Sequence, residues 1–253
     1  MSLTGQHAVV TGAGSGIGRA TAEHLAELGA QVTLVGRHVG RLHETADRIG
    51  PAAFVAPTDV TDADALAAAI DAGRDRFGPV DILVNNAGAA SSAPFLRTGP
   101  DAFRAMLALS LEAPAEASRL VLPGMVTRRS GRIVNVASTA GLKGYAYVSA
   151  YVAAKHGLVG LTRSLALEFA DKGVTINAVC PGFTETGLVA EAVAAIVTKT
   201  GRTEDDARTA LAASNPQGRL ITPEEVASAV GWLCSPAASG VNGATLTVAG
   251  GEL

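Results

Sequence analysis

Cysteine is scarce in this sequence of 253 residues, and neither sign of charge is in large excess. The two cysteines, Cys180 and Cys234, are too few for a disulfide framework, so a reducing cytoplasm is the simplest expectation. Twenty basic and twenty-three acidic side chains give a formal net charge of −3. Because the chain has no basic run to hold a phosphate backbone, we expect no nucleic-acid partner.

Long apolar runs and metal-ligand clusters are also missing. The most apolar stretches, such as Val32–Val35 and Ile82–Val84, are far shorter than the roughly 20 residues of a membrane-spanning helix. The first residues have no basic region followed by an apolar core, so we expect no secretory signal. The five histidines show no ligand-like pairing with one another or with cysteine. These absences predict a cytoplasmic protein with no metal site and no membrane partner.

Short β-branched runs alternate with longer segments rich in alanine and leucine. Runs that are apolar on both faces are typical of parallel strands covered by helices on both sides. The alternation predicts an α/β fold, a single doubly wound Rossmann-type domain over residues 1–253 with a seven-stranded parallel sheet. The expected strands are His7–Thr11, Gln31–Val35, Ala53–Ala56, Ile82–Asn85, Arg132–Val136, Thr175–Val179 and Ala244–Val248, and the expected helices include Ile17–Leu28, Ala63–Phe77, Ala150–Asp171 and one that begins at Thr222–Glu225.

A glycine-rich turn, Thr11–Gly18, lies between the first expected strand and the first expected helix. Glycines there permit a sharp turn and a close approach of the backbone to a pyrophosphate, and the helix N-terminus adds partial positive charge. A purely structural turn is the alternative, but the strand–turn–helix context favours dinucleotide binding. The residues expected to hold the cofactor here are Gly12, Ser15, Gly16, Ile17 and Gly18.

The end of the second expected strand lacks the acid that usually bonds the ribose 2′-hydroxyl of NAD. Arg37 stands there instead, and its guanidinium can pair with a 2′-phosphate. The alternative is that Arg37 is a solvated residue at a helix start, and Ser15 leaves the turn without a second basic residue. The sequence therefore favours NADP, with NAD as the remaining possibility.

Tyr151 and Lys155 are four residues apart on the long expected helix, so they share one face. An unperturbed phenol has a pKa of about 10, and a nearby ammonium is expected to lower that pKa. Ser138 follows the fifth expected strand, and its hydroxyl can hydrogen-bond a carbonyl oxygen. Tyrosine and lysine at this spacing are common on helix surfaces, and only their ordered combination with Ser138 and the turn is specific.

Taken in order along the chain, these motifs resemble the short-chain dehydrogenase/reductase family. The likeness runs from Thr11–Gly18 to Ala249–Gly251, through Asp59-Val60, Asn85–Gly88 and Pro181-Gly182. It implies that Tyr151 is the acid–base, that Ser138 orients the substrate oxygen, and that Lys155 binds the nicotinamide ribose and lowers the tyrosine pKa. The further cofactor contacts it implies are Asp59 and Val60 at the adenine, Asn86, Ala87 and Gly88 along the cofactor, and Pro181, Gly182, Thr184 and Thr186 near the nicotinamide, together with Tyr151 and Lys155. Asp59 has a structural alternative, as a cap.

One position departs from the family pattern. The family usually has a catalytic asparagine in the helix after the fourth strand, and Ser110 stands there, within Ala108–Glu112. In the family this asparagine helps to hold a water that connects the lysine to solvent, and a hydroxyl reaches less far than an amide. We count Ser110 among the candidate catalytic residues and expect activity with an altered proton relay.

A variable segment, about residues 187–215, carries no family motif. It is expected to form two helices, Leu188–Thr198 and Thr203–Ala213, which act as a lid that excludes water from the substrate or as a subunit contact. Its length and its exit through Asn215–Arg219 resemble members that act on 3-oxoacyl thioesters, polyketide carbonyls or 3-hydroxybutyrate. The mostly apolar candidates for the pocket wall are Ala140, Leu142, Tyr145, Tyr147, Phe183 and Leu188, and Arg97, Lys143 and Lys199 are either solvated cations or contacts for an anionic carrier.

The resemblance predicts an NADPH-dependent oxidoreductase that interconverts a ketone, including a 3-oxoacyl thioester, and a secondary alcohol. One alternative is an NAD-dependent 3-hydroxyacid or alcohol dehydrogenase of the same family. Another, prompted by Ser110, is a catalytically weak, cofactor-binding regulatory protein. A sugar-nucleotide epimerase would need a larger substrate domain. The expected partners are a small-molecule substrate and three further copies of the chain, because the family commonly forms tetramers.

Overall fold

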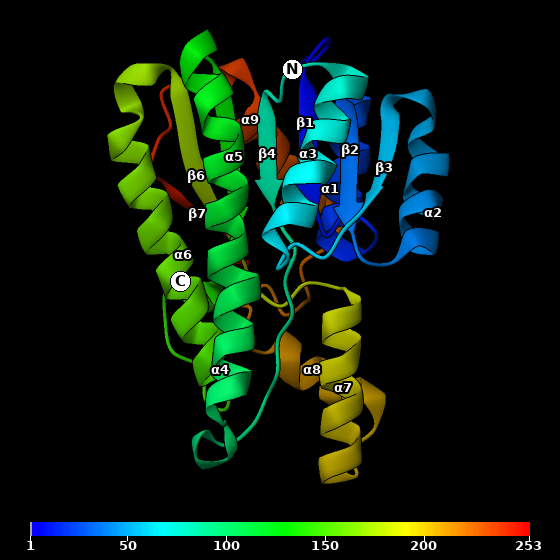
Figure 1. The fold of residues 1–253 in the computed structure, drawn as a ribbon. Helices are drawn as coiled ribbons and strands as arrows, with labels where there is room; N and C mark the ends of the chain where they lie inside the picture. The colour runs from blue at the N-terminus through cyan, green and yellow to red at the C-terminus, as the bar shows by residue number, and fades with distance from the viewer. Residues whose placement is uncertain (1) are drawn as a thin grey trace.

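The computed structural model describes residues 2–253. Its centre is a parallel sheet of seven strands in the order β3-β2-β1-β4-β5-β6-β7 (Figure 1). The order reverses between β1 and β4, where sheets of this kind bind their ligands. The strands are β1 His7–Thr11, β2 Gln31–Gly36, β3 Ala53–Pro57, β4 Ile82–Asn85, β5 Gly131–Val136, β6 Val174–Pro181 and β7 Thr245–Val248. The predicted doubly wound α/β fold with seven parallel strands is confirmed.

Helices cover both faces of this sheet. One layer contains α1, α2 and α9, and the other contains α3, α5 and α6, with α4 leading into α5 (Figure 1). The helices are α1 Gly16–Glu27, α2 Val39–Ile49, α3 Ala63–Phe77, α4 Pro100–Leu107, α5 Ala113–Arg128, α6 Ser149–Glu168, α7 Gly187–Thr200, α8 Glu204–Ala212 and α9 Pro223–Cys234. Within residues 2–253 no helix is both long and apolar enough to cross a membrane.

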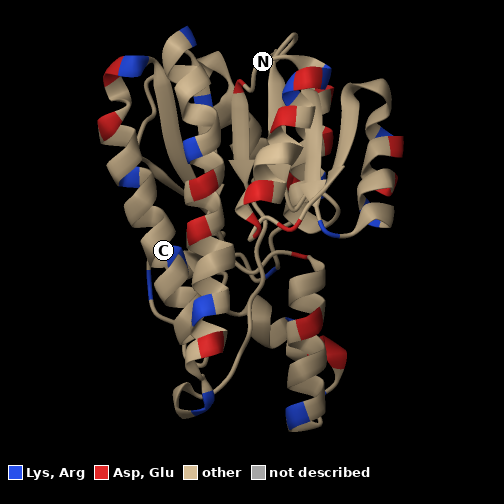
Figure 2. Ribbon diagram, viewed as in Figure 1, with Lys and Arg blue, Asp and Glu red and all other residues tan. Residues whose placement is uncertain are grey.

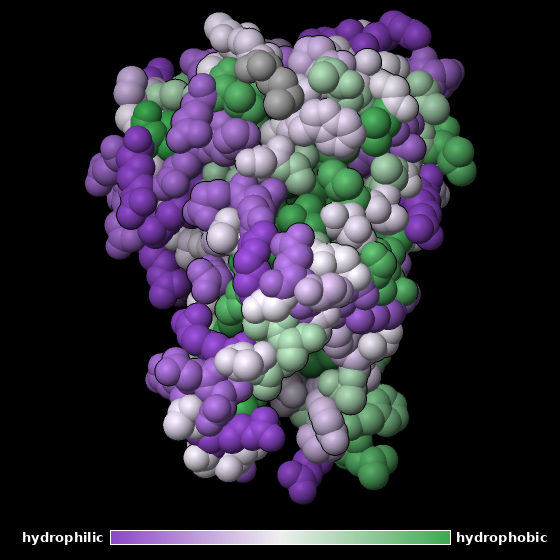
Figure 3. Space-filling view, turned by 180° about the vertical axis from the view of Figure 1, so that it is seen from behind, coloured by the Kyte–Doolittle hydropathy of each residue, from purple (hydrophilic) through white to green (hydrophobic). Residues whose placement is uncertain are grey.

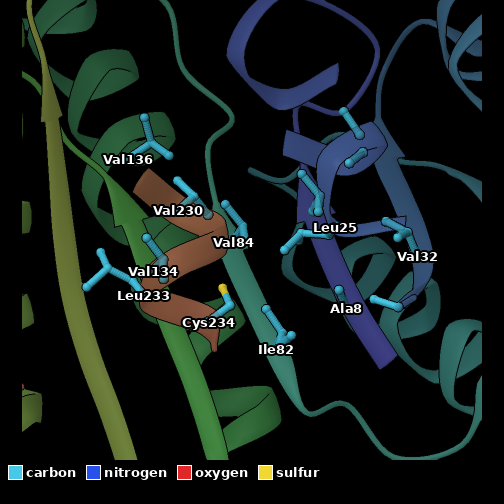
Figure 4. Close-up of a cluster of buried hydrophobic side chains, with 14 of the residues drawn as sticks. Ala8, Leu25, Val32, Ile82, Val84, Val134, Val136, Val230, Leu233 and Cys234 are labelled. Carbon is cyan, nitrogen blue, oxygen red and sulfur yellow. The ribbon is translucent and has the colours of Figure 1, made fainter. Parts of the chain in front are cut away.

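Alternate residues of the strands supply the two apolar interiors. In β1, Ala8 and Val10 face the α1 and α9 side, where Leu25 and Leu233 are fully buried, and Val9 faces the α3 and α5 side. Figure 4 shows the first of these clusters, with α9 lying across β4 and β5. Burying one such leucine contributes about 1.5–3 kcal/mol. Side chains buried on both sides explain why each strand reads as a continuous apolar run.

Local caps set the beginnings of several helices. The Asp62 side chain accepts hydrogen bonds from the backbone N–H groups of Asp64 and Ala65 at the start of α3. Thr222 and Glu225 form a reciprocal capping box at the start of α9.

Charged residues of both signs are interspersed over the helices, as Figure 2 shows.

Helices α7 and α8 lie beyond the carboxyl ends of the strands, in the segment predicted to be variable (Figure 1). They have a small apolar cluster of their own, which includes Val189, Val193 and Ala207. A single parallel bridge between Thr184 and Ile221 joins the two ends of this segment. Figure 3 shows hydrophobic surface at the same end of the molecule. The exposed large hydrophobic side chains of the protein include Phe95, Leu96, Tyr147 and Leu188.

Candidate functional site

The glycine-rich turn is packed tightly against the residues that follow β4. A Cβ on Gly12, which has a φ of +68°, would lie 2.7 Å from Asn86 Nδ2, and one on Gly18 would lie 2.2 Å from the Gly12 carbonyl oxygen. Asn86 Nδ2 donates to the Thr11 carbonyl at 2.9 Å. The N–H groups of Asn86 and Ala87 donate to Thr11 Oγ1 at 2.9 and 3.0 Å. These contacts join the ends of β1 and β4, where the strand order reverses. They leave the glycine turn as a cradle, a concave stretch of backbone with no side chain at Gly12 or Gly18.

The same turn borders the base of the variable segment. Gly16 has a φ of +52°, and a Cβ on it would lie 2.9 Å from Thr186 Cγ2. Thr186 is the N-cap of α7, and its hydroxyl donates to the Thr184 carbonyl at 3.2 Å. Thr184 is buried, and its own hydroxyl donates to the Gly182 carbonyl at 3.0 Å. Gly16 and Thr186 also line a cleft of about 460 Å³ beside α1, and Tyr151 is not among the residues that line it.

Arg37 and Asp59 face each other at the outer end of the crevice. Arg37 Nη1 lies 4.0 Å from Asp59 Oδ2, and both side chains are exposed, so this ion pair contributes little to stability. Asp59 Oδ1 accepts from the N–H and hydroxyl of Thr61 at 3.0 and 2.7 Å, which lowers the pKa of the carboxyl. Asp59 therefore closes a turn with Thr61 and does not cap a helix, since the N-cap of α3 is Asp62, while Oδ2 remains directed at Arg37. Val60 beside it is buried.

A second cation, Arg41, lies beside the turn and was missed from the sequence. A Cβ added to Gly14 would lie 3.1 Å from Arg41 Cβ, so α2 brings this residue against the turn. Arg41 is exposed, lies in the first turn of α2 and stands four residues after Arg37. The turn itself has no second basic residue, because Ser15 stands there as the N-cap of α1. The spacing of four residues between Arg37 and Arg41 was the feature of the sequence that could have indicated a second cation.

Ser138, Tyr151 and Lys155 come together where β5 ends against α6. The Ser138 hydroxyl accepts from the Ala140 N–H at 3.1 Å and hydrogen-bonds with the Tyr151 hydroxyl. Lys155 Nζ lies 5.7 Å from the centroid of the Tyr151 ring. A Cβ on Gly88, which follows β4, would lie 3.9 Å from the same nitrogen. Two neighbouring strand ends and one helix therefore build a single polar centre.

The pKa of Tyr151 differs from the sequence-based expectation. Burial raises this pKa, and the hydrogen bond with Ser138 opposes the increase only in part. Lys155 is 4% exposed, its ammonium donates to the Val136 carbonyl at 2.8 Å, and burial lowers the pKa of Lys155 to about 8. The expected net lowering of the tyrosine pKa was wrong, because the loss of solvent on burial sets the direction.

Ser110 lies in a π-helical turn, Ala108–Glu112, between α4 and α5. It is buried, and its hydroxyl donates to Met106 Sδ at 3.6 Å. Met106 in turn packs in the cluster that contacts Tyr151. No hydrogen bond joins Ser110 to Lys155 in residues 2–253, so the altered proton relay stays a prediction. π-Helical turns of this kind are frequent at functional sites.

Glu252 is a buried acid near this centre that the sequence did not indicate. Its side chain is 2% exposed, and Oε1 lies 3.0 Å from Lys143 Nζ. The Tyr145 hydroxyl donates to the same oxygen at 2.5 Å. Lys143 is therefore already paired within the chain. Cys180, also close to the centre, is fully buried, and burial raises the pKa of its thiol to about 11, as suits a small packed residue rather than a nucleophile.

Comparisons with known proteins agree over nearly the whole chain. A sequence profile described as short chain dehydrogenase matches residues 6–196. The 3-oxoacyl-(acyl-carrier-protein) reductase of Vibrio cholerae is 41% identical over 251 residues, which cover 99% of this chain and 98% of that protein. The cis-4-hydroxycyclohexanecarboxylate dehydrogenase of Sinomonas cyclohexanicum is 44% identical over 252 residues, with 96% and 95% coverage. A solved structure of an actinorhodin polyketide ketoreductase with NADPH matches with a TM-score of 0.94 at 36% identity, covering 100% of this chain and 99% of that chain.

Proposed function

This chain belongs to the short-chain dehydrogenase family, and from that premise we propose that it is an NADPH-dependent oxidoreductase that reduces a ketone to a secondary alcohol. The observation that carries the proposal is the grouping of Ser138, Tyr151 and Lys155 beyond the ends of β4 and β5. A 3-oxoacyl thioester is among the proposed substrates, because the Vibrio cholerae relative is a 3-oxoacyl-(acyl-carrier-protein) reductase. Residues 1–253 serve as one dinucleotide-binding and catalytic domain, with 187–215 as the substrate lid.

The cradle fits a dinucleotide. No Cβ has room at Gly12 or Gly18, so backbone N–H groups at the start of α1 stay open to a pyrophosphate. Arg37 and Arg41 supply two cations for a 2′-phosphate, which supports NADPH over NADH. The other residues that would hold the cofactor are Ser15, Gly16, Ile17, Asp59, Val60, Asn86, Ala87, Gly88, Tyr151, Lys155, Pro181, Gly182, Thr184 and Thr186.

Bound NADPH supplies the hydride that reduces the carbonyl carbon. Tyr151 donates its phenolic proton to the carbonyl oxygen, and its raised pKa keeps that proton in place at neutral pH. Ser138 donates a hydrogen bond to the same oxygen as negative charge develops there. Lys155, one turn away, stabilises the phenolate that remains. Ser110 takes part in returning a proton from solvent to this group.

The substitution Tyr151→Phe tests the proposal. Removing the phenolic proton is expected to reduce kcat for ketone reduction by about 100-fold or more. NADPH affinity, measured by nucleotide fluorescence, should stay within about threefold, because the ring and Lys155 remain.

Ser164→Ala is the matched control, since it removes an exposed hydroxyl from the same helix, α6. This variant should retain full turnover. Turnover of Tyr151→Phe at a rate close to that of the unsubstituted protein would contradict the proposed acid. Uniform inactivity on a broad panel of ketones and alcohols, despite tight NADPH binding, would favour the regulatory alternative that Ser110 suggests.

A second candidate function is the oxidation of a hydroxyacid or alcohol with NAD. The observation in its favour is the 44% identity to the cis-4-hydroxycyclohexanecarboxylate dehydrogenase. Steady-state rates with NADPH and NADH across the ketone panel, and with NADP⁺ and NAD⁺ across the alcohols, separate the two candidates. A tenfold or greater preference for NAD(H) would establish the second.

We propose that the oligomeric state of the protein is a homotetramer and that its compartment is the cytoplasm. Two observations support it: Leu167 on α6 is 82% exposed, as suits a helix that packs against another copy, and both cysteines are free and buried, which suits a reducing compartment. Light scattering coupled to gel filtration measures the number of subunits.

A further inference from the structure

Glu252 forms a buried polar network with residues of the loop after β5. Its Oε1 accepts from the Tyr145 hydroxyl at 2.5 Å and lies 3.0 Å from Lys143 Nζ, while the carboxylate side chain is 2% exposed. The Lys143 ammonium also lies 5.2 Å from the centroid of the Tyr145 ring. A buried carboxylate is costly unless it is paired and hydrogen-bonded. The three side chains therefore hold one another in a defined arrangement.

This network extends to the proposed catalytic centre. Thr139 directly follows Ser138, and Thr139 Oγ1 lies 2.7 Å from the Tyr145 hydroxyl. The Tyr145 ring packs edge-on against Phe183, with the ring centroids 6.4 Å apart. Burial raises the pKa of Tyr145, the bond to Glu252 raises it further, and Tyr151 adds a small contribution in the same direction. Tyr145 thus stands between Glu252 and the Ser138–Tyr151 pair.

On its other side, Glu252 fills space beside Gly182. A Cβ on Gly182 would lie 3.1 Å from Glu252 Oε2, which is buried and has no hydrogen-bond partner. The Gly182 N–H donates to the Val248 carbonyl at 3.0 Å, and the Glu252 N–H donates to the Ala249 carbonyl at 3.2 Å. Glu252 therefore connects the loop after β5 to the loop after β6, which carry the candidate pocket-wall residues Tyr145 and Phe183.

We propose that Glu252 is a positioning residue that determines substrate specificity by holding the Tyr145 hydroxyl away from the substrate. This inference rests on the proposed ketone reduction. The Tyr145 hydroxyl donates its one hydrogen to Glu252 and is also bonded to Thr139, so no hydrogen remains for it to donate to a ligand. The side chain then offers the substrate its ring, next to Phe183, and no donor. The pocket selects ketones that carry hydrocarbon beside the carbonyl over ketones that carry a hydroxyl there.

The first experiment compares Glu252→Ala, Glu252→Gln and Tyr145→Phe with the unsubstituted protein. Glu252→Ala is expected to raise KM for cyclohexanone about tenfold and to leave kcat and the KM for NADPH within about twofold, because it releases Tyr145 without touching the catalytic hydroxyls. Glu252→Gln keeps an acceptor of the same shape and is expected to restore KM to within about twofold. Lys143 is 37% exposed and can turn to water in that variant.

The second experiment measures the ratio of kcat/KM for 2-hydroxycyclohexanone to that for cyclohexanone. Glu252→Ala is expected to raise this ratio at least fivefold, since the freed phenol can then bond the substrate hydroxyl. Tyr145→Phe, and the double variant of Glu252→Ala with Tyr145→Phe, should show no such increase, because neither has the phenol hydroxyl. An increase that persists in the double variant, or no increase in Glu252→Ala, would overturn the proposal.

Controls separate this inference from folding and from the proposed function. If Glu252→Ala unfolds, Tyr145→Phe decides the outcome alone: because the hydroxyl that it removes does not face the substrate, the ratio of kcat/KM for 2-hydroxycyclohexanone to that for cyclohexanone must stay within about twofold of that of the unsubstituted protein. A larger change in that ratio would overturn the proposal. Loss of turnover in Tyr151→Phe together with unchanged kinetics in every Glu252 and Tyr145 variant would overturn only the positioning role. Full turnover in Tyr151→Phe, or an inactive unsubstituted protein, would remove the proposed reaction and this inference with it.

Discussion

The two halves of the crevice beyond the sheet are built in different ways. The cofactor half, around the turn Thr11–Gly18 and Asn86, is held by close packing of the glycine backbone and by hydrogen bonds of the Thr11 and Asn86 side chains to the backbone, which leave no room for a side chain at Gly12 or Gly18. The substrate half, around Tyr145, Glu252 and the lid, is held by side-chain hydrogen bonds and by a separate apolar cluster. Close packing around Gly12 and Gly18 admits no added side chain, whereas a network of side chains can be exchanged one residue at a time.

The substitution Gly18→Ala is expected to have the largest effect, because it breaks the cofactor half. The new Cβ would lie 2.2 Å from the Gly12 carbonyl oxygen, so the turn must shift or the protein loses stability. We expect NADPH affinity to fall at least 100-fold and Tm to fall by several degrees, measured by fluorescence titration and calorimetry.

The matched control is Gly160→Ala on α6, where a new Cβ meets nothing within 4 Å. This variant should bind NADPH like the unsubstituted protein and should have an equal or higher Tm, since alanine favours a helix over glycine. Equal behaviour of the two alanine variants would show that the cofactor half is not set by close backbone packing.

Replacing Arg37 and Arg41 by alanine sharpens the comparison between the two halves of the crevice. It tests how much two exposed side chains, as opposed to the glycine turn, contribute to cofactor binding. Each guanidinium that meets the 2′-phosphate is expected to contribute about tenfold to NADPH affinity, and the double variant should lose more than either single one. NADH affinity should stay unchanged. Arg104→Ala, which removes an exposed cation on α4, is the control. An equal loss for NADPH and NADH would contradict the assignment of the 2′-phosphate to these residues.

The pH dependence gives the smallest effect and concerns the boundary between the halves, where Lys155 lies. Its pKa of about 8 means that the ammonium loses its charge as the pH rises through this value. The developing phenolate of Tyr151 then loses its stabilising cation, so kcat/KM for reduction should be constant between about pH 6 and 7 and fall about tenfold per unit well above 8.

Lys155→Arg separates this effect from titration of the phenol. Arginine stays charged throughout the range, so the decline near pH 8 should disappear even where the overall rate is lower. Because the pKa of Tyr151 lies above its usual value of about 10, the phenol keeps its proton over this range. Persistence of the decline in Lys155→Arg would assign it to another group.

Most of the fold was predictable from sequence because each strand is buried on both faces and several helices carry their own caps. The range Ala63–Phe77 was predicted at both ends, where Asp62 caps the start and Gly78 follows the end. The end of α6 was placed too late, because the helix stops at Glu168 and a short 3₁₀ turn follows. Strand β6 was expected to end at Val179 but continues to Pro181, since β7 pairs with its last residues. Such boundaries depend on tertiary neighbours.

The candidate site was predictable only where a motif marks it. Ser138, Tyr151 and Lys155 were named from their order and spacing, and the structure brings them together. Glu252 and Arg41 carry no motif, because their positions depend on packing between segments distant in sequence. The increase in the pKa of Tyr151 could not be predicted from sequence either, because the burial that causes it is a property of the folded protein.

The separate apolar interior of α7 and α8 has a consequence for how this protein changes over time. A segment that contains its own packing, and that is joined at its base by the bridge between Thr184 and Ile221, can accumulate substitutions without disturbing the sheet. New substrates can therefore arise by exchange of a cassette of about thirty residues, while the nucleotide-binding turn stays under the strict steric limits of its glycines.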